Sequence, residues 1–157
     1  MAYLDSNQLQ IFFQLFLAAL LGGAIGFERK YVGRPAGMRT YALVCVGAAL
    51  FTILSTQAFA KFTAQPNNFD PSRIASNVVV GIGFIGAGLI VFRMGRIEGL
   101  TTAAGLWLTA GIGMAVGVKF YLVSIFAALL AFFVISIFGW FEDVLISPRE
   151  EKTQNEE

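Results

Sequence analysis

The 157-residue chain has no histidine, a single cysteine and few charged side chains. The lack of histidine excludes a histidine-based catalytic triad and a histidine-ligated metal site. Cys45 has no second cysteine to pair with, which excludes an internal disulfide. Charged residues make up 13% of the chain, whereas soluble domains contain about 25%. Because 57% of the residues are hydrophobic, too little polar surface remains to cover a water-soluble globule, and a membrane protein is indicated.

Charged residues are absent from five windows of 19 to 22 residues. A helix rises about 1.5 Å per residue and the hydrocarbon core is about 30 Å thick, so each window is about one span long. Lipid offers the backbone no hydrogen-bond partner, so the spans must be helical. We therefore predict an all-α membrane protein, a five-helix transmembrane bundle. The predicted spans cover residues 9–27, 40–60, 74–92, 100–118 and 120–141.

Lysine and arginine are unevenly distributed between the two sides of these spans. With the N-terminus outside and the C-terminus in the cytoplasm, eight basic residues are cytoplasmic and three are external, as the positive-inside rule requires. The first window lacks a basic N-terminal region and follows Asp5, so we expect an uncleaved helix and not a signal peptide. The transmembrane domain is expected over residues 1–141, followed by a short polar cytoplasmic tail over residues 142–157.

Small residues recur four positions apart in three of the spans. The pairs are Gly22 with Gly26, Gly83 with Ala87, and Gly113 with Gly117. In lipid, such pairs let helix backbones approach closely. Packing within one chain is the simpler interpretation, and a homodimer is the alternative. The fifth span is bulky and rich in phenylalanine, and we expect it to face lipid.

No acidic or basic side chain lies inside a predicted span, which weakens a pump or carrier that depends on intramembrane charges. The polar candidates are Asn77, Gln14, Gln57, Thr101, Thr102 and Thr109. Such residues more often form helix–helix hydrogen bonds than ligand sites. We expect Asn77 to be turned toward the bundle and hydrogen-bonded, because an amide in lipid needs partners. We expect no cofactor and no bound metal.

The most concentrated chemistry lies at the predicted cytoplasmic mouth of the bundle. Gly33, Pro35 and Gly37 favour a tight return between the first two helices. The candidate site residues are Glu28, Arg29, Gly33, Arg34, Gly37, Arg39 and Thr40, with Glu98 from the second cytoplasmic loop. We expect Glu28, Arg34 and Arg39 to form one charge-assisted network, with Glu98 as a further member. The alternative is a topology signal that contacts lipid head groups. No nucleophile–base pair is visible, so we expect no enzymatic activity.

Three segments carry a resemblance to a known family. They are GGAIGFERKYVGRPAGMRTYALVCVGAALF (22–51), SNVVVGIGFIGAG (76–88) and GLTTAAGLWLTAGIGMAVG (99–117). In these segments the chain resembles the MgtC/SapB family of bacterial membrane proteins over roughly residues 9–140. The resemblance implies a multi-pass protein of the bacterial inner membrane, linked to low-magnesium adaptation, acid stress and virulence. Many members also have a small C-terminal ACT-like domain, which this sequence lacks.

Two classes of function follow from the resemblance and the charge pattern. Some family members restrain the proton-translocating ATP synthase, which implies a regulatory protein that binds another membrane complex. Others are named magnesium transporters, which implies a transporter or channel for Mg²⁺ or another small solute. Mg²⁺ prefers carboxylate ligands and keeps several waters, and a mouth with six basic residues repels it, so the regulatory class is favoured. The expected partners are the lipid bilayer, another membrane protein complex and a second copy of the chain, but no nucleic acid.

Overall fold

The computed structural model describes residues 6–58, 70, 72–93 and 95–145. Its α-helices are α1 (Ser6–Tyr31), α2 (Met38–Ile53), α3 (Ser72–Ala87), α4 (Leu100–Gly117), α5 (Tyr121–Phe133) and α6 (Gly139–Leu145). Two segments are π-helical. The first, η1 (Leu54–Ala58), extends α2, and the second, η4 (Val134–Phe138), joins α5 to α6. Strands β1 (Val91–Arg93) and β2 (Arg96–Glu98) form an antiparallel hairpin.

A helix lies in each of the five predicted windows. Four are long and apolar enough to cross a membrane, namely α1, α2 with η1, α4, and the continuous helix from α5 into α6. The remaining helix, α3, is apolar but has 16 residues. Its length of about 24 Å is shorter than a hydrocarbon core of about 30 Å. In its main elements the chain is an all-α membrane protein, whereas its orientation across the membrane stays a prediction.

The predicted third span is wrong at its C-terminal end. Helix α3 stops at Ala87, and the last two residues of the predicted span lie in strand β1, in which Val91 pairs with Glu98. Gly99 closes the hairpin with a φ of 91°, and a Cβ atom there would overlap the carbonyl of Leu89. A run of apolar residues without charge does not distinguish a short strand from the end of a helix, and this caused the error.

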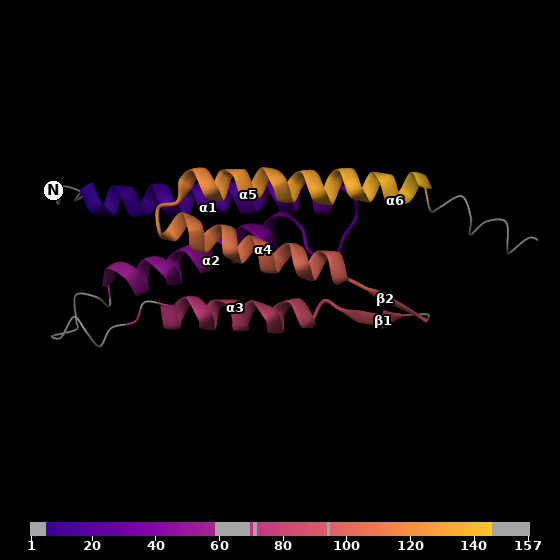
Figure 1. Cartoon of the computed structure of the whole chain (residues 1–157), viewed down its shortest axis with the longest axis horizontal. Coiled ribbons are helices and arrows are strands. Elements are labelled where there is room, and N and C mark those ends of the chain that lie inside the picture. Colours follow the sequence, from indigo (N-terminus) through magenta and orange to yellow (C-terminus); the bar gives the residue numbers. More distant parts are fainter. Residues whose placement is uncertain (1–5, 59–69, 71, 94, 146–157) are drawn as a thin grey trace, which may run out of the picture.

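Helix α4 lies at the centre of the bundle and packs against α1, α2, α3 and α5 (Figure 1). Of its membrane span, 56% is buried within the chain, compared with 17% for the span of α5 to α6. The turn between α1 and α2, the β-hairpin and the end of α6 lie at one end of the bundle (Figure 1). The start of α1 and the turn between α4 and α5 lie at the other end.

Glycines set how closely α1, α2 and α4 approach one another. A Cβ atom at Gly22 would lie 2.6 Å from the carbonyl oxygen of Tyr41, and one at Gly26 would lie 2.7 Å from Cα of Met38. On α4, a Cβ atom at Gly113 would overlap the carbonyl oxygen of Cys45. Real Cβ atoms do not approach backbone so closely, so the three helices can pack in this way because these positions lack a side chain. The close contact of α2 with α1 and α4 at these glycines is called the glycine seam.

The remaining two glycines of the predicted packing set differ from each other. Gly117 also lies in the glycine seam, where a Cβ atom would come 2.7 Å from Cβ of Thr52. Gly83 on α3 is exposed, and no atom of the described residues lies within 4 Å of the position its Cβ would take. The pattern of small residues four positions apart is the same on α3 as on α1 and α4, but none of the described helices packs against Gly83.

Candidate functional site

Backbone hydrogen bonds close the end of α1 and start α2. Gly33 adopts a φ of 74°, a left-handed conformation that suits glycine. The amide of Gly33 donates to the carbonyl of Lys30 at 3.2 Å, and the amide of Arg34 donates to the carbonyl of Arg29 at 2.9 Å. Three residues later the carbonyl of Gly37 accepts the amide of Tyr41 at 3.1 Å, which begins α2. The glycines therefore make the tight return that their spacing predicts.

Glu28 and Arg29 form a buried ion pair at the end of α1. Nε of Arg29 donates to Oε2 of Glu28 at 2.5 Å, and Nη2 of Arg29 donates to Oε1 at 2.9 Å. The side chains are 5% exposed for Arg29 and 12% exposed for Glu28. A guanidinium that engages both oxygens of a carboxylate in this way forms two parallel charge-assisted hydrogen bonds. The pair therefore shields both charges from most of the solvent at the end of the bundle.

Tyr41 of α2 ties this end of the bundle to α4. Its side chain is fully buried, and its hydroxyl donates to the carbonyl oxygen of Thr102 at 3.2 Å. A Cβ atom at Gly105 would lie 2.6 Å from the tyrosine hydroxyl oxygen, so Gly105 provides the space for the phenol. Tyr41 therefore joins α2 to α4 through a buried hydrogen bond.

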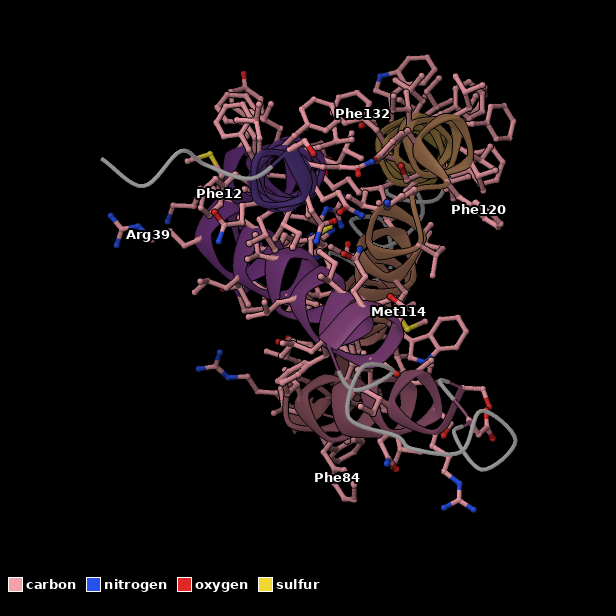
Figure 2. All side chains as sticks on the ribbon, turned by 90° about the vertical axis from the view of Figure 1, so that its left-hand side faces the viewer. Phe12, Arg39, Phe84, Met114, Phe120 and Phe132 are labelled. Atoms are coloured by element: carbon pink, nitrogen blue, oxygen red, sulfur yellow. The ribbon has the colours of Figure 1, made fainter. Side chains whose placement is uncertain are left out.

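The structure differs from the expected network of Glu28, Arg34 and Arg39. Glu28 is engaged by its own neighbour, while Arg34 and Arg39 are exposed and make no ion pair with the described residues. Figure 2 shows Arg39 projecting away from the bundle. The physical reason is helical geometry, since residues two positions apart point to different faces and Tyr41 occupies the core face of α2. Thr40 is partly exposed, and Glu98 is exposed on strand β2.

The burial of Arg29 is the feature that reading the sequence missed. The buried residues of α1 are Gln14, Ala18, Gly22, Ile25, Gly26 and Arg29. They recur at intervals of three and four, which places them on one face of the helix. This spacing is visible in the sequence and predicts that Arg29, and not Lys30, lies on the core face.

Gln14 joins α1 to the other end of α4. Its Nε2 donates to the carbonyl of Val116 at 2.8 Å and to that of Gly117 at 2.9 Å, and its side chain is fully buried. These carbonyls lie in the last turn of α4, where helix carbonyls lack an intrahelical donor, and that of Val116 also accepts the amide of Lys119 at 3.0 Å. Gln14 is therefore a helix cap supplied by another helix, in agreement with the helix–helix hydrogen bond expected for intramembrane polar residues.

The other intramembrane polar candidates fall in different environments. Thr102 is buried, and Oγ1 of Thr109 donates to the carbonyl of Gly105 at 2.8 Å within α4. Thr101 is exposed. Asn77 is exposed on α3 and lines an open groove beside α2, and it does not form the expected hydrogen bond with any of the described residues. Within the described ranges, three or more acidic or cysteine side chains do not come together as a metal site would require.

The chain is similar in sequence to several known proteins. The chain is 47% identical over 126 residues to the "Putative magnesium transporter YhiD" of Escherichia coli K12, covering 80% of this chain and 59% of that protein. It is 42% identical over 126 residues to "Protein SrpB" of Synechococcus elongatus, covering 72% of this chain and 66% of SrpB. It is 48% identical over 103 residues to "Protein MgtC" of Salmonella typhimurium, covering 66% of this chain and 41% of that protein.

No solved structure matches the chain significantly. The chain spans about three fifths of YhiD and two fifths of MgtC. The family model described as the MgtC family matches residues 15–144, a range that includes the ion pair, α2, α3, α4 and most of α1. The chain belongs to the MgtC family.

Proposed function

We propose that this chain is a regulatory protein of the bacterial inner membrane that acts by contacting another membrane complex during adaptation to low magnesium. The observation that carries the proposal is the state of Glu28, whose two carboxylate oxygens both accept from Arg29. Mg²⁺ is bound through free carboxylate oxygens and keeps several waters. A carboxylate held by a guanidinium stabilises the end of the bundle and is a poor ligand for this ion.

The exposed basic side chains at the same end provide a surface for a partner. Arg34 and Arg39 are exposed beside the buried pair, and Lys30 is exposed on the last turn of α1. Positive groups arranged around a rigid centre favour an acidic surface on the partner and speed its association. The resemblance to the MgtC/SapB family suggests the proton-translocating ATP synthase as this partner, and the proposal assigns the chain no catalytic activity.

The test is ATP-driven proton pumping in inverted membrane vesicles that contain the chain. We expect the chain to lower the pumping rate, measured with a pH-sensitive dye, and the variant with Arg34→Gln and Arg39→Gln to restore it. Lys119→Gln is the matched control, because Lys119 is an exposed cation at the other end of the bundle. Equal pumping with the parent chain, both variants and no chain would contradict the proposal.

Orientation is part of the proposal, because the basic surface must face the cytoplasm to meet the catalytic part of such a complex. A reporter fused after Glu157 should therefore be active in the cytoplasm, and activity outside would rule the proposal out.

Transport of magnesium is the alternative function, and the name of the relative "Putative magnesium transporter YhiD" points to it. Growth at low Mg²⁺ of a strain that lacks its own magnesium transporters separates the two. The regulatory proposal predicts that expression of the chain does not restore magnesium uptake. Restored uptake together with unchanged proton pumping would favour the transporter.

A further inference from the structure

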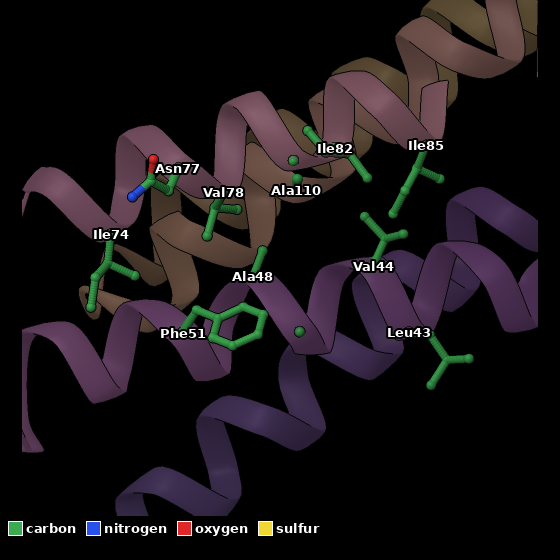
Figure 3. A pocket seen from close by; sticks show the side chains of 12 residues that line it. Leu43, Val44, Ala48, Phe51, Ile74, Asn77, Val78, Ile82, Ile85 and Ala110 are labelled. Atoms are coloured by element: carbon green, nitrogen blue, oxygen red, sulfur yellow. The ribbon is translucent and has the colours of Figure 1, made fainter. Parts of the chain in front are cut away.

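An open apolar groove of about 560 Å³ runs between α2 and α3 (Figure 3). The side chains that form its walls include Leu43 and Phe51 of α2, Ile74 and Ile85 of α3, and Ala110 of α4. The groove exists because α3 packs mainly on α4 and less on α2. Gly47 and Gly81 also line it, and a Cβ atom at either position would have no neighbour within 4 Å.

The length of the groove matches one leaflet of a membrane. Ile74 and Ile85 lie near its two ends (Figure 3) and are 11 residues apart on one helix. A separation of 11 residues corresponds to about 16 Å along the helix axis. One leaflet contributes about half of a hydrocarbon core that is about 30 Å thick. An acyl chain of one leaflet therefore fits the groove along its length.

Asn77 places a polar amide at the end of the groove nearest the start of α3. The side chain lines the groove and is drawn with its amide beside Ile74 (Figure 3). It is exposed and has no hydrogen-bond partner among the described residues. An amide without a partner is costly at membrane depth. A ligand that brings oxygen atoms to this level of the membrane would remove that cost.

Two opposite charges lie beyond Asn77 at the start of α3. Arg73 precedes Asn77 by four residues, so the two side chains lie on the same face of the helix, and Arg73 is exposed. Asp70 is exposed too, and its Oδ1 accepts from the amide of Ser72 at 2.9 Å and from the hydroxyl of Ser72 at 2.6 Å. These hydrogen bonds hold the pKa of Asp70 below its usual range, so its carboxylate is charged at neutral pH.

We propose that the groove binds one acyl chain of a zwitterionic phospholipid of the phosphatidylethanolamine type. The acyl chain fills the groove, and an ester or glycerol oxygen accepts a hydrogen bond from the amide of Asn77. The phosphate pairs with Arg73, and the ammonium group pairs with Asp70. The proposal depends on the membrane architecture and is independent of the regulatory function.

Native mass spectrometry of the detergent-purified full chain tests the groove itself. Phosphatidylethanolamine and phosphatidylglycerol are added in equal amounts, and the lipid retained by each variant is measured. Gly81→Leu fills the groove, whereas Gly83→Leu adds the same side chain to the same helix outside the lining. We expect phosphatidylethanolamine binding to be about tenfold weaker in Gly81→Leu, equivalent to about 1.4 kcal/mol, and unchanged in Gly83→Leu. Equal retention by the two variants would overturn the proposal.

The head-group contacts are tested by Asn77→Leu and Asp70→Asn. Asn77→Leu keeps the groove apolar and should weaken binding of both lipids. Asp70→Asn removes the partner of the ammonium and should abolish the preference for phosphatidylethanolamine. Equal binding of the two lipids by the parent chain would overturn the head-group assignment. A dimer that forms in place of lipid binding, and that Gly81→Leu disrupts, would show that a second copy occupies the groove and would overturn the proposal as a whole.

Discussion

The same kinds of residue occur in the seam where α1, α2 and α4 meet and in the groove beside α3. They are closely packed in the seam and exposed beside α3. In the seam, glycines bring backbones into contact, and the arginine and glutamine on α1 are buried with partners. Beside α3, glycines face open space and the amide of Asn77 is exposed. The comparison shows that residue type alone does not determine packing in a membrane bundle. A glycine or polar side chain is packed and buried only where a neighbouring helix lies against the helix face that carries it.

The largest effect is expected at the ion pair, where Arg29 and Arg39 carry the same charge in different surroundings. Arg29→Gln leaves the buried carboxylate of Glu28 without its partner, which should destabilise the fold by about 3–5 kcal/mol. Arg39→Gln changes an exposed side chain and should leave stability within about 0.5 kcal/mol of the parent. Unfolding of both purified variants in mixed micelles measures the difference. Similar stability of the two would show that the buried pair contributes little.

Reading the sequence could predict much of the fold but not the partner of Glu28. Charge-free windows predict five helices, and the spacing of three and four along α1 predicts that Gln14 and Arg29 share its core face. The choice of partner for Glu28 depends on the direction in which α2 leaves the turn, and no short-range pattern contains that direction. The end of α3 was missed because Val91 and Phe92 are as apolar in a strand as in a helix.

A smaller effect is expected when alanine replaces Gly113 or Gly111, two residues of the same helix. Alanine at Gly113 would overlap the carbonyl of Cys45 and should destabilise by about 1–3 kcal/mol, since backbone must shift to accept it. Alanine at Gly111 meets no atom within 4 Å, and it should stabilise slightly because alanine favours a helix by up to about 1 kcal/mol. Thermal unfolding in detergent compares the two. A lower melting temperature for Gly111→Ala than for Gly113→Ala would refute the seam.

The smallest effect is expected when Gln14 and Gln10, one turn apart on α1, are each replaced by methionine. Gln14→Met removes two hydrogen bonds to the last turn of α4 and should cost about 1.5 kcal/mol, because the carbonyl of Gly117 loses this donor while that of Val116 keeps the amide of Lys119. Gln10→Met loses an exposed contact in which Nζ of Lys119 donates at 3.0 Å, and should cost less than about 1 kcal/mol. Hydrogen exchange at the end of α4 provides the measurement. Faster exchange is expected in Gln14→Met alone, and unchanged exchange there would exclude the capping function.

In the proposed function, the charged centre at the end of α1 stabilises a contact surface and does not conduct a cation. Magnesium entry into liposomes that contain the purified full chain and an internal Mg²⁺-sensitive dye tests this claim most directly. We expect the rate of entry to equal that of protein-free liposomes, for the parent chain and for Glu28→Gln alike. Magnesium entry above that background, lost in Glu28→Gln while Lys119→Gln retains it, would contradict the account and identify Glu28 as part of a cation path.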